Sequence, residues 1–386
     1  MPSGLILGIE TSCDETAAAV VRAGEQMLSS VVASQLAAHQ PYGGVVPELA
    51  AREHLRAIVP VVRKALADAK LMLEDVDAIA VTQGPGLAGA LLVGISYAKA
   101  VAFALDKPLI AVNHLEGHIH AVLLEERQRG NYELQFPLLA LVVSGGHTHL
   151  YLAEQQGASW TYENIGSTRD DAAGEAFDKV AKLLGLGYPG GPLIDMLSQF
   201  GDAEAVPFAL VQLKGKSRSP SKRHLGRSGG ELTFDFSYSG MKTALLRYTE
   251  THDMKASIEA RRHALLQIAK PALEDYKRLC DQPTLDLIAS FQRGMVDDLA
   301  AKTMNAVREC GTATLLVTGG VAANSALRQT FEREAAMEGV VVHFPSRAMS
   351  TDNAAMIAAA AYPKFLAGDF AEADFSAEAG LGLGRS

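Results

Sequence analysis

Short apolar segments rich in β-branched residues alternate along this chain with longer segments in which apolar residues recur every three to four positions. The first pattern predicts buried strands, and the second predicts helices. The expected strands are residues 5–10, 17–22, 77–82, 109–112, 138–143, 148–153, 313–318 and 339–344. The expected helices are residues 47–69, 87–105, 113–127, 172–184, 256–278, 284–309, 323–338 and 353–367. Strands interleaved with helices in this way predict an α/β fold.

Two of these segments share one internal order of apolar and polar residues. Residues 5–21 form an apolar run, a polar turn and a second apolar run, and residues 138–153 repeat this order around a Ser-Gly-Gly-His-Thr turn. Each segment predicts a β-hairpin. A hairpin repeated once at long spacing favours two related lobes.

Length and composition narrow the class of protein. The chain has 386 residues, of which 48% are hydrophobic and 20% are charged, and its formal net charge is −9. This composition is that of a globular protein with one large two-lobed unit or two to three domains, and it excludes a disordered chain. A uniformly basic surface that coats nucleic acid is also excluded, although a local basic patch is not.

No feature of the sequence predicts a membrane or secreted protein. Residues 86–105 are apolar, but they are mostly small and include Ser96 and Lys99, so we expect a buried helix packed on a sheet. The N-terminus lacks a basic region, and Glu10 interrupts its apolar run. Three widely spaced cysteines fit no disulfide framework. We therefore expect a cytoplasmic protein.

Residues 214–230 differ from the rest of the chain. They contain six Lys or Arg residues, no acidic residue, and many Ser and Gly. Such a segment cannot bury an apolar face, so it should be a loop. It is either a solvated insertion or a flexible contact to nucleic-acid phosphates.

A histidine pair is the first candidate for chemistry. His114 and His118 are four positions apart, so on a helix both rings lie on one face and can bind one metal ion. Two solvated histidines are the alternative. The order excludes the zinc-protease motif HExxH, because Leu115 follows the first histidine. Glu116 and His120 should face away from such a metal.

A third metal ligand must come from elsewhere in the chain. Asp352 precedes an alanine-rich helix pattern, so it is either this ligand or the helix N-cap. Two histidines and one carboxylate would leave coordination positions open. This set suits Fe²⁺ or Zn²⁺ used for chemistry.

Glycine-rich turns follow three of the expected strands, at residues 82–86, 144–148 and 318–321. Glycine lets the backbone approach a ligand, and N–H groups at such turns favour anions. The last two turns, together with the polar turn Glu10-Thr11-Ser12 of the first hairpin, indicate a nucleotide-phosphate site. We expect residues 82–86 to be a tight strand–helix turn. No Walker A or GxGxxG motif follows any strand.

Acidic residues flank a further glycine-rich segment, residues 188–192. They are Asp170, Asp171, Glu175, Asp178 and Asp195. A solvated acidic face is one interpretation. Hydrogen bonding to ribose hydroxyls or to an adenine amine is the other.

Ten segments together resemble the bacterial tRNA N6-adenosine threonylcarbamoyltransferase family, once labelled O-sialoglycoprotein endopeptidase. These segments are GIETSCDET (8–16), GGVVPELAAREH (43–54), TQGPGLAGALLVG (82–94), NHLEGHIHA (113–121), VVSGGHT (142–148), DDAAGEAFDK (170–179), YPGGP (188–192), FSYSGMKTAL (236–245), TGGVAAN (318–324) and STDNAAM (350–356). The resemblance covers nearly the whole chain.

The resemblance implies the two-lobed actin/sugar-kinase/Hsp70-like (ASKHA) fold with duplicated lobes. Residues 1–112 with about 346–386 would form one lobe, and residues 113–345 the other, with a basic insertion at 214–230. The implied reaction transfers the threonylcarbamoyl group from threonylcarbamoyl-AMP to the N6 amine of the tRNA adenosine 3′ of the anticodon, releasing AMP. The implied partners are tRNA, an inactive paralogue of the same fold and a P-loop ATPase.

The resemblance also assigns roles to single positions. The implied metal ligands are His114, His118 and Asp352, with Fe²⁺ expected and Zn²⁺ as the alternative. The implied substrate-binding residues are Val142, Val143, Ser144, Gly145, Gly146, His147, Asp178, Gly191, Asp195 and Asn324. Asp14 and Glu15 would lie near the reacting group. The alternative functions are a small-molecule kinase of the same fold, a metalloprotease and a nucleotide-binding scaffold.

Overall fold

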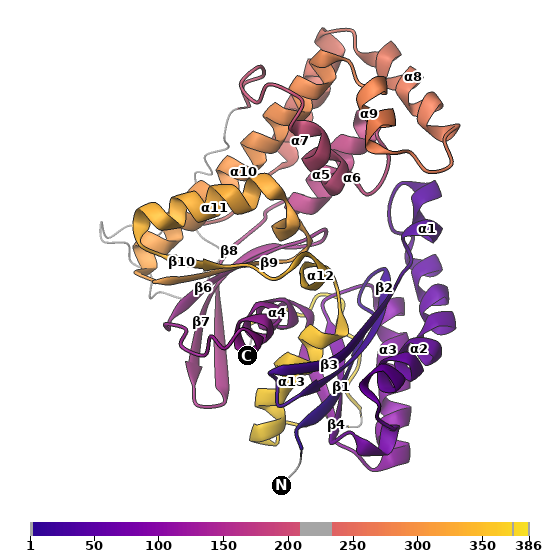
Figure 1. Cartoon of the computed structure of the whole chain (residues 1–386), viewed down its shortest axis with the longest axis vertical. Coiled ribbons are helices and arrows are strands. Elements are labelled where there is room, and N and C mark those ends of the chain that lie inside the picture. Colours follow the sequence, from indigo (N-terminus) through magenta and orange to yellow (C-terminus); the bar gives the residue numbers. More distant parts are fainter. Residues whose placement is uncertain (1–2, 209–233, 373, 385–386) are drawn as a thin grey trace. The chain divides into compact units, whose positions relative to one another are not determined.

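The computed structural model describes residues 3–208, 234–372 and 374–384 (Figure 1). The chain forms two compact units. The first comprises Met1–Ala140, Leu152–Glu163 and His343–Ser386, and the second comprises Leu141–Tyr151 and Asn164–Val342. The boundary expected at residue 112 falls inside the first unit, which continues to Ala140. The basic segment 214–230 lies outside the described residues.

The first unit is built on a five-stranded sheet in the order β3-β2-β1-β4-β5. Its strands are β1 (Leu5–Glu10), β2 (Glu15–Arg22), β3 (Gln26–Ser34), β4 (Ala78–Gly84) and β5 (Leu109–Asn113). β1 pairs antiparallel with β2, which confirms the first expected hairpin, and parallel with β4. β4 is also parallel to β5. The carboxyl ends of three strands therefore meet at one edge of this sheet.

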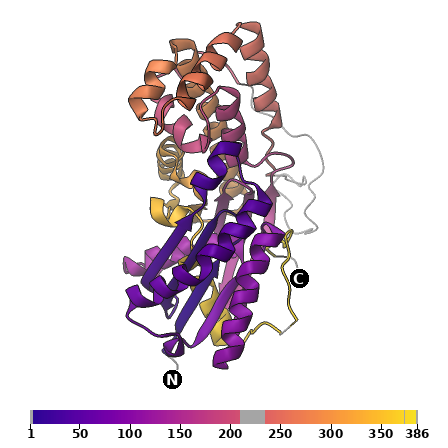
Figure 2. The same ribbon diagram turned by 90° about the vertical axis from the view of Figure 1, so that its right-hand side faces the viewer.

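Helices cover both faces of this sheet. The helical segments of the first unit are α1 (Leu36–His39), η1 (Gln40–Tyr42), α2 (Pro47–Ala69), η2 (Leu73–Asp75), α3 (Ala88–Leu105), α4 (His114–Gln128), α12 (Arg347–Ser350) and α13 (Ala354–Ala367). α2 and α3 lie side by side on one face (Figure 2). α13 packs on the opposite face, with α4 beside it (Figure 1).

Helices pack on both faces of the sheet, which explains why β1 is apolar on both of its faces. Leu7 and Ile9 belong to the core under α2 and α3, whereas Ile6 belongs to the core under α13. Gly8 also faces α13. A Cβ atom there would lie 2.3 Å from the carbonyl oxygen of Ala354, so α13 can approach only a glycine.

The second unit contains most of a sheet in the order β10-β9-β6-β7-β8. Its strands are β6 (Leu138–Val143), β7 (Thr148–Gln156), β8 (Ser159–Ser167), β9 (Thr314–Thr318) and β10 (Val341–His343). Read from β8, this order is third, second, first, fourth, fifth, as in the first sheet. The expected α/β fold with duplicated lobes is therefore confirmed.

The helices of the second unit lie between β8 and β10 in the chain. They are α5 (Ala173–Leu183), α6 (Gly190–Ser198), α7 (Ser239–Thr251), α8 (Lys255–Leu266), α9 (Leu273–Leu279), α10 (Gln282–Cys310), η3 (Gly320–Ala323) and α11 (Ser325–Glu338). The long helix α10 packs against α6 and α11.

One expected helix, residues 256–278, is wrong. The structure has two helices there, and residues 267–272 separate α8 from α9. Pro271 lies in this gap. A proline disfavours helical backbone in the residue before it, so the helix ends before the proline.

The expected burial of residues 86–105 is only partly right. α3 is long and apolar enough, by length and composition, to cross a membrane, and it is the one such helix among the residues searched, which are those the structure describes. Ala90, Leu91 and Ile95 are buried on the sheet side. Leu92 and Phe103, however, are 51% and 92% exposed. One face of α3 packs on the sheet and the other does not.

The expected tight turn at residues 82–86 is confirmed, since β4 ends at Gly84 and α3 begins at Ala88. Two close approaches require its glycines. A Cβ atom on Gly84 would lie 1.9 Å from the carbonyl oxygen of Glu378, and one on Gly86 would lie 2.6 Å from that of Ser12. The turn after β4 thus packs directly on the turn after β1.

We predict that Gly8→Ala lowers the free energy of unfolding by about 1–3 kcal/mol, because the new methyl group overpacks the contact with α13. Urea unfolding followed by circular dichroism measures this change. Gly89→Ala is the matched control, since its Cβ would lie 3.4 Å from that of Ala51, an ordinary contact. Equal stability of the two variants would contradict the prediction.

Candidate functional site

The histidine pair lies in the first turn of α4, directly after β5. Asn113 caps this helix, and its Oδ1 accepts a hydrogen bond from the Leu115 N–H at 2.9 Å. His114 is therefore the first helical residue, at the carboxyl edge of the sheet. Its ring centroid lies 4.7 Å from that of His118. The expectation that both rings share one helix face is confirmed.

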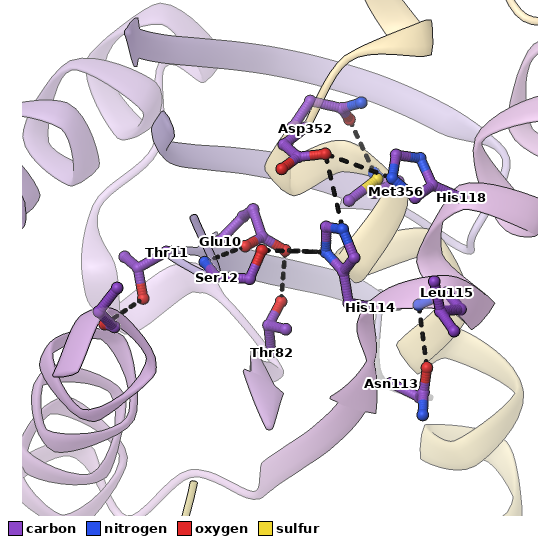
Figure 3. A network of polar contacts seen from close by, with 12 residues as sticks. Glu10, Thr11, Ser12, Thr82, Asn113, His114, Leu115, His118, Asp352 and Met356 are labelled. Carbon is purple, nitrogen blue, oxygen red and sulfur yellow. Dashed lines mark hydrogen bonds and ion pairs between the residues drawn. The ribbon is translucent and has the colours of Figure 1, made fainter. Parts of the chain in front are cut away.

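Asp352 lies beside both rings (Figure 3). Its Oδ1 is 3.6 Å from His114 Nε2 and 3.3 Å from His118 Nε2. One ligand atom from each of the three residues lies within 4.8 Å of the others. Asp352 is not the helix N-cap, because Asn353 takes that position and its side chain accepts from the Met356 N–H at 3.0 Å.

A close helix contact brings the three residues together. Gly117 lies between the two histidines, and a Cβ atom there would be 2.8 Å from Ile357 Cδ1 and 3.2 Å from Met356 Cγ. A larger residue would require the Ile357 and Met356 side chains to move. The glycine therefore allows close packing of α4 on α13, the helix that begins just after Asp352.

A buried carboxylate lies on the other side of His114. Glu10 ends β1, and its Oε2 is 3.1 Å from His114 Nδ1. The Thr82 hydroxyl donates to the same oxygen at 2.6 Å, and the Ser12 N–H donates to Oε1. Burial opposes ionisation of Glu10, but the His114 ring and the Thr82 hydroxyl outweigh it, so the pKa of this carboxyl is lowered.

Negative charge accumulates around the pair. Burial disfavours the imidazolium form of His114, but the carboxylates of Asp352 and Glu10 outweigh burial and raise its pKa to about 9. Burial, followed by the charges of Asp352 and Asp14, also raises the pKa of Glu15 to about 9. Without a cation, this site therefore holds extra protons at neutral pH.

Asp14 and Glu15 lie at the turn between β1 and β2 and at the first residue of β2. Glu15 Oε1 is 3.5 Å from the Ser34 hydroxyl, and the Asp14 carbonyl accepts from the Gln35 N–H at 2.9 Å. Glu15 interacts electrostatically with Asp352, the third candidate metal ligand, and with Asp14.

The other polar residues of α4 face away, as expected. Glu116 Oε2 is 3.8 Å from Lys364 Nζ, and His120 Nε2 is 3.0 Å from the Tyr162 hydroxyl. A protease mechanism would need a carboxylate beside the histidines on the same helix. Glu116 does not meet this need.

The donor set fits a divalent cation. Two imidazoles and one carboxylate converge, with a surplus of negative charge that a cation would offset. Three protein ligands leave positions for water or substrate. The site is therefore a candidate metal centre of the catalytic kind.

The second unit gathers the expected glycine turns. Ser144 N–H donates to the His147 carbonyl at 2.8 Å, which closes the β6–β7 hairpin turn. Gly174 of α5 packs against this turn, and a Cβ there would lie 2.6 Å from the Ser144 carbonyl oxygen. Gly319, with φ of 93°, lies equally close to Val143. The two turns therefore adjoin at the ends of β6 and β9.

The exposed part of this turn is backbone. Val142 and Val143 are buried in β6, whereas Gly145 and Gly146 are exposed, with open space where a side chain would be. His147 lies at the end of the turn, its ring centroid 5.7 Å from that of His149. Open glycine backbone at the end of a strand is suited to hold an anion.

The other residues expected to bind substrate lie at or near the first turns of α6 and α11. Asp178 Oδ1 accepts from the Gly190 N–H at 2.7 Å, where α6 begins. Asp195 of α6 accepts from the Ser325 N–H and hydroxyl, at 3.1 and 2.7 Å. Asn324 caps α11, accepting from the Leu327 N–H at 2.9 Å. Gly191 has open space at its Cβ position.

Asp170, Asp171 and Glu175 are paired within the chain, although Asp170 is exposed. Asp170 accepts hydrogen bonds from Ser237 and Ser239 at the start of α7. Asp171 forms an ion pair with Lys179 at 2.7 Å, and Glu175 pairs with the same lysine at 2.8 Å. These acids therefore stabilise the local fold.

Sequence reasoning placed Glu10 and Ser12 in a turn near a nucleotide-phosphate site, but it missed the contacts of both residues with His114 and of Thr82 with Glu10. The available signal was the position of Glu10, a charged residue at the end of a fully apolar strand. A carboxylate there must be buried, and a buried carboxylate needs polar partners.

The chain was compared with known proteins. The family model of tRNA N6-adenosine threonylcarbamoyltransferase matches residues 26–359. A protein of that name from Koribacter versatilis is 67% identical over 99% of this chain and 100% of its own length. Another from Syntrophobacter fumaroxidans is 49% identical over 93% of each chain.

A structural comparison bears on the fold alone. The structure of full-length HypF in its phosphate- and nucleotide-bound form is 13% identical, with a TM-score of 0.51 over 94% of this chain and 46% of that one. This likeness and the two sheets of equal strand order agree with the expected ASKHA fold. The family model and the relatives, by their extent, show that the chain belongs to the tRNA N6-adenosine threonylcarbamoyltransferase family.

Proposed function

We propose that this chain transfers the threonylcarbamoyl group from threonylcarbamoyl-AMP to the N6 amine of the tRNA adenosine 3′ of the anticodon, and releases AMP. Membership of the family supports the reaction. The observation that carries the proposal is the convergence of His114, His118 and Asp352 on one point of the first unit.

These three residues would hold one divalent cation, for which we propose Fe²⁺, with Zn²⁺ as the alternative. Imidazole nitrogen and carboxylate oxygen suit both ions. When bound, such a cation supplies Lewis acidity to an oxygen of the threonylcarbamoyl group. The open coordination positions would admit that oxygen.

Asp14 and Glu15 are proposed to act at the reacting group. The N6 amine is a weak nucleophile and loses a proton as it is acylated. A nearby carboxylate can accept that proton. Glu15 is protonated in the metal-free protein because its pKa is raised, and a bound cation would favour its ionised form.

The second unit is proposed to bind the AMP part of the donor. The turn at residues 142–146, with His147 beside it, would hold the phosphate through the exposed backbone of Gly145 and Gly146 and stabilise its charge as AMP leaves. Asp178, Gly191 and Asp195 would hold the ribose, and Asn324 would contact the nucleotide. In the structure Asp178, Asp195 and Asn324 also order the helix ends around these turns.

The alternative functions have weaker support. A small-molecule kinase would share the glycine turns, but the chain belongs to a transferase family. A zinc protease of the HExxH type would need its glutamate directly after the first histidine, whereas Leu115 stands there and Glu116 faces Lys364. We further propose that the enzyme acts in the cytoplasm, with an inactive paralogue of the same fold and a P-loop ATPase.

Reconstitution tests the reaction. The purified chain is incubated with threonylcarbamoyl-AMP, the two companion proteins and tRNA that reads codons beginning with A. We expect threonylcarbamoyladenosine in the digested tRNA, by mass spectrometry, and AMP in equal amount. Unmodified tRNA with ADP and a phosphorylated small molecule would instead indicate a kinase.

Removing a metal ligand should abolish both binding and turnover. We expect His118→Ala or Asp352→Ala to lose the bound ion by elemental analysis and to lower kcat/KM by at least about 100-fold, because each removes a ligand of the polarising cation. His120→Gln is the matched control, as its ring faces Tyr162. Retained metal in both ligand variants would contradict the assignment.

The basic segment 214–230 is proposed to contact tRNA phosphates. Replacing its six Lys and Arg residues by Ser should weaken tRNA binding and make it less dependent on salt. The variant would make fewer phosphate contacts, so its binding would release fewer counterions from the tRNA. Filter binding at several salt concentrations measures both effects. Replacing the exposed Lys255 and Arg262 is a control for net charge. Unchanged affinity at low salt would refute the contact.

A further inference from the structure

Glu10 has no assigned part in the reaction, yet it is placed behind a candidate metal ligand. Its side chain is fully buried, with a relative exposure of 0%. A buried carboxylate is costly unless its oxygens are hydrogen-bonded. Its Oε2 lies 3.1 Å from Nδ1 of His114, on the side of the ring away from Asp352 (Figure 3).

Two donors that belong to the surrounding fold fix this carboxylate. The Thr82 hydroxyl donates to Oε2 at 2.6 Å, and the backbone N–H of Ser12 donates to Oε1. The parallel pairing of β1 with β4, which aligns Ile9 with Val81, places Thr82 beside Glu10. The carboxylate therefore has supports other than His114. The Ser12 hydroxyl also lies 3.2 Å from Nδ1 of His114, on the same side as Glu10.

The fixed carboxylate decides which nitrogen of His114 keeps a hydrogen. Ionised carboxylate oxygens only accept hydrogen bonds, so the nitrogen that faces Glu10 carries the N–H. Nε2 then points to Asp352 Oδ1, at 3.6 Å, together with His118 Nε2 at 3.3 Å from the same atom. When a cation displaces the proton from Nε2, the lone pair of that nitrogen is directed to the place where the cation would bind.

We propose that Glu10 is a positioning residue for the metal centre: it holds the His114 ring in the Nδ1–H tautomer and in the orientation that presents Nε2 to the cation. Thr82 and Ser12 support it in this role. A carboxylate that orients a ligating histidine typically changes metal affinity by about 10- to 100-fold. The inference rests on the proposed metal site.

The simplest competing explanation is structural. Glu10 also fixes the turn after β1 through Ser12, and Leu87 N–H donates to the Ser12 carbonyl at 2.8 Å. A merely structural role would lower stability and leave metal affinity unchanged. The experiment therefore reads metal binding directly.

The test is titration of the metal-free, full-length protein with Zn²⁺ by calorimetry and with Co²⁺ by visible absorption. Glu10→Gln keeps the size and shape of the side chain but removes its negative charge. The new amide can also donate a hydrogen bond, whereas the carboxylate only accepts. We expect this variant to bind Zn²⁺ about 10- to 100-fold more weakly and to show an altered Co²⁺ spectrum. We expect Thr82→Val, which removes a hydrogen bond to Glu10 and keeps the carboxylate, to weaken binding in the same direction by a smaller factor.

Glu116→Gln is the matched control. This carboxylate is also buried and lies on the same helix as His114, but it faces Lys364 at 3.8 Å. Its variant should bind Zn²⁺ as the unchanged protein does. If Glu10→Gln does not fold, Thr82→Val alone decides, because it retains the carboxylate and perturbs only its support.

The outcomes separate the two proposals. Wild-type affinity and Co²⁺ spectrum in both Glu10→Gln and Thr82→Val, with binding lost in His118→Ala, would overturn the positioning role and leave the metal site intact. Equal Zn²⁺ affinity of His118→Ala and the unchanged protein would overturn the metal site and the positioning role together. Weakening in the Glu10 and Thr82 variants but not in Glu116→Gln supports the inference.

Discussion

The close approach of α4 to α13 is the contact on which the candidate site depends. It is possible because Gly117 presents no side chain to Ile357 and Met356. Gly8 of β1 allows an equally close contact between α13 and the sheet. One glycine thus lies between α13 and α4, and the other lies between α13 and the sheet. Asp352, just before this helix, is thereby held within reach of both imidazoles, although it is distant from them in the sequence.

Electrostatics then determines what this geometry can hold. Glu10 and Asp352 flank His114 on its two sides, and Glu15 is near enough to Asp352 for their charges to interact. A protein interior seldom tolerates so many acids around one point without protons or a cation. The site compensates with protons when it is metal-free. A divalent ion would replace them, which couples metal binding to proton release.

Much of this structure follows from local patterns in the sequence. The strand at residues 5–10 and the helix at 47–69 match their observed bounds, since each has strong periodicity or a continuous apolar run. The half-exposed strand β3 was not predicted, because only one of its nine residues is fully buried. The break between α8 and α9 contains Pro271. The helix expected at 256–278 was predicted from the spacing of apolar residues, which does not take a proline into account. The spacing of His114 and His118 predicted a shared ligand, and the family resemblance implied Asp352 as the third residue. The contact of Glu10 with His114 was not predicted, because it depends on tertiary packing.

The order of the chain also has a consequence for synthesis. The first sheet is complete once β5 has left the ribosome, but the face that α13 covers stays without its cover until residues 354–367 emerge. The nascent protein must therefore carry an exposed apolar surface while the whole second unit is being translated. The histidines exist throughout that interval without their aspartate. The ligand set of the candidate metal centre is therefore completed only late in synthesis, after the whole second unit.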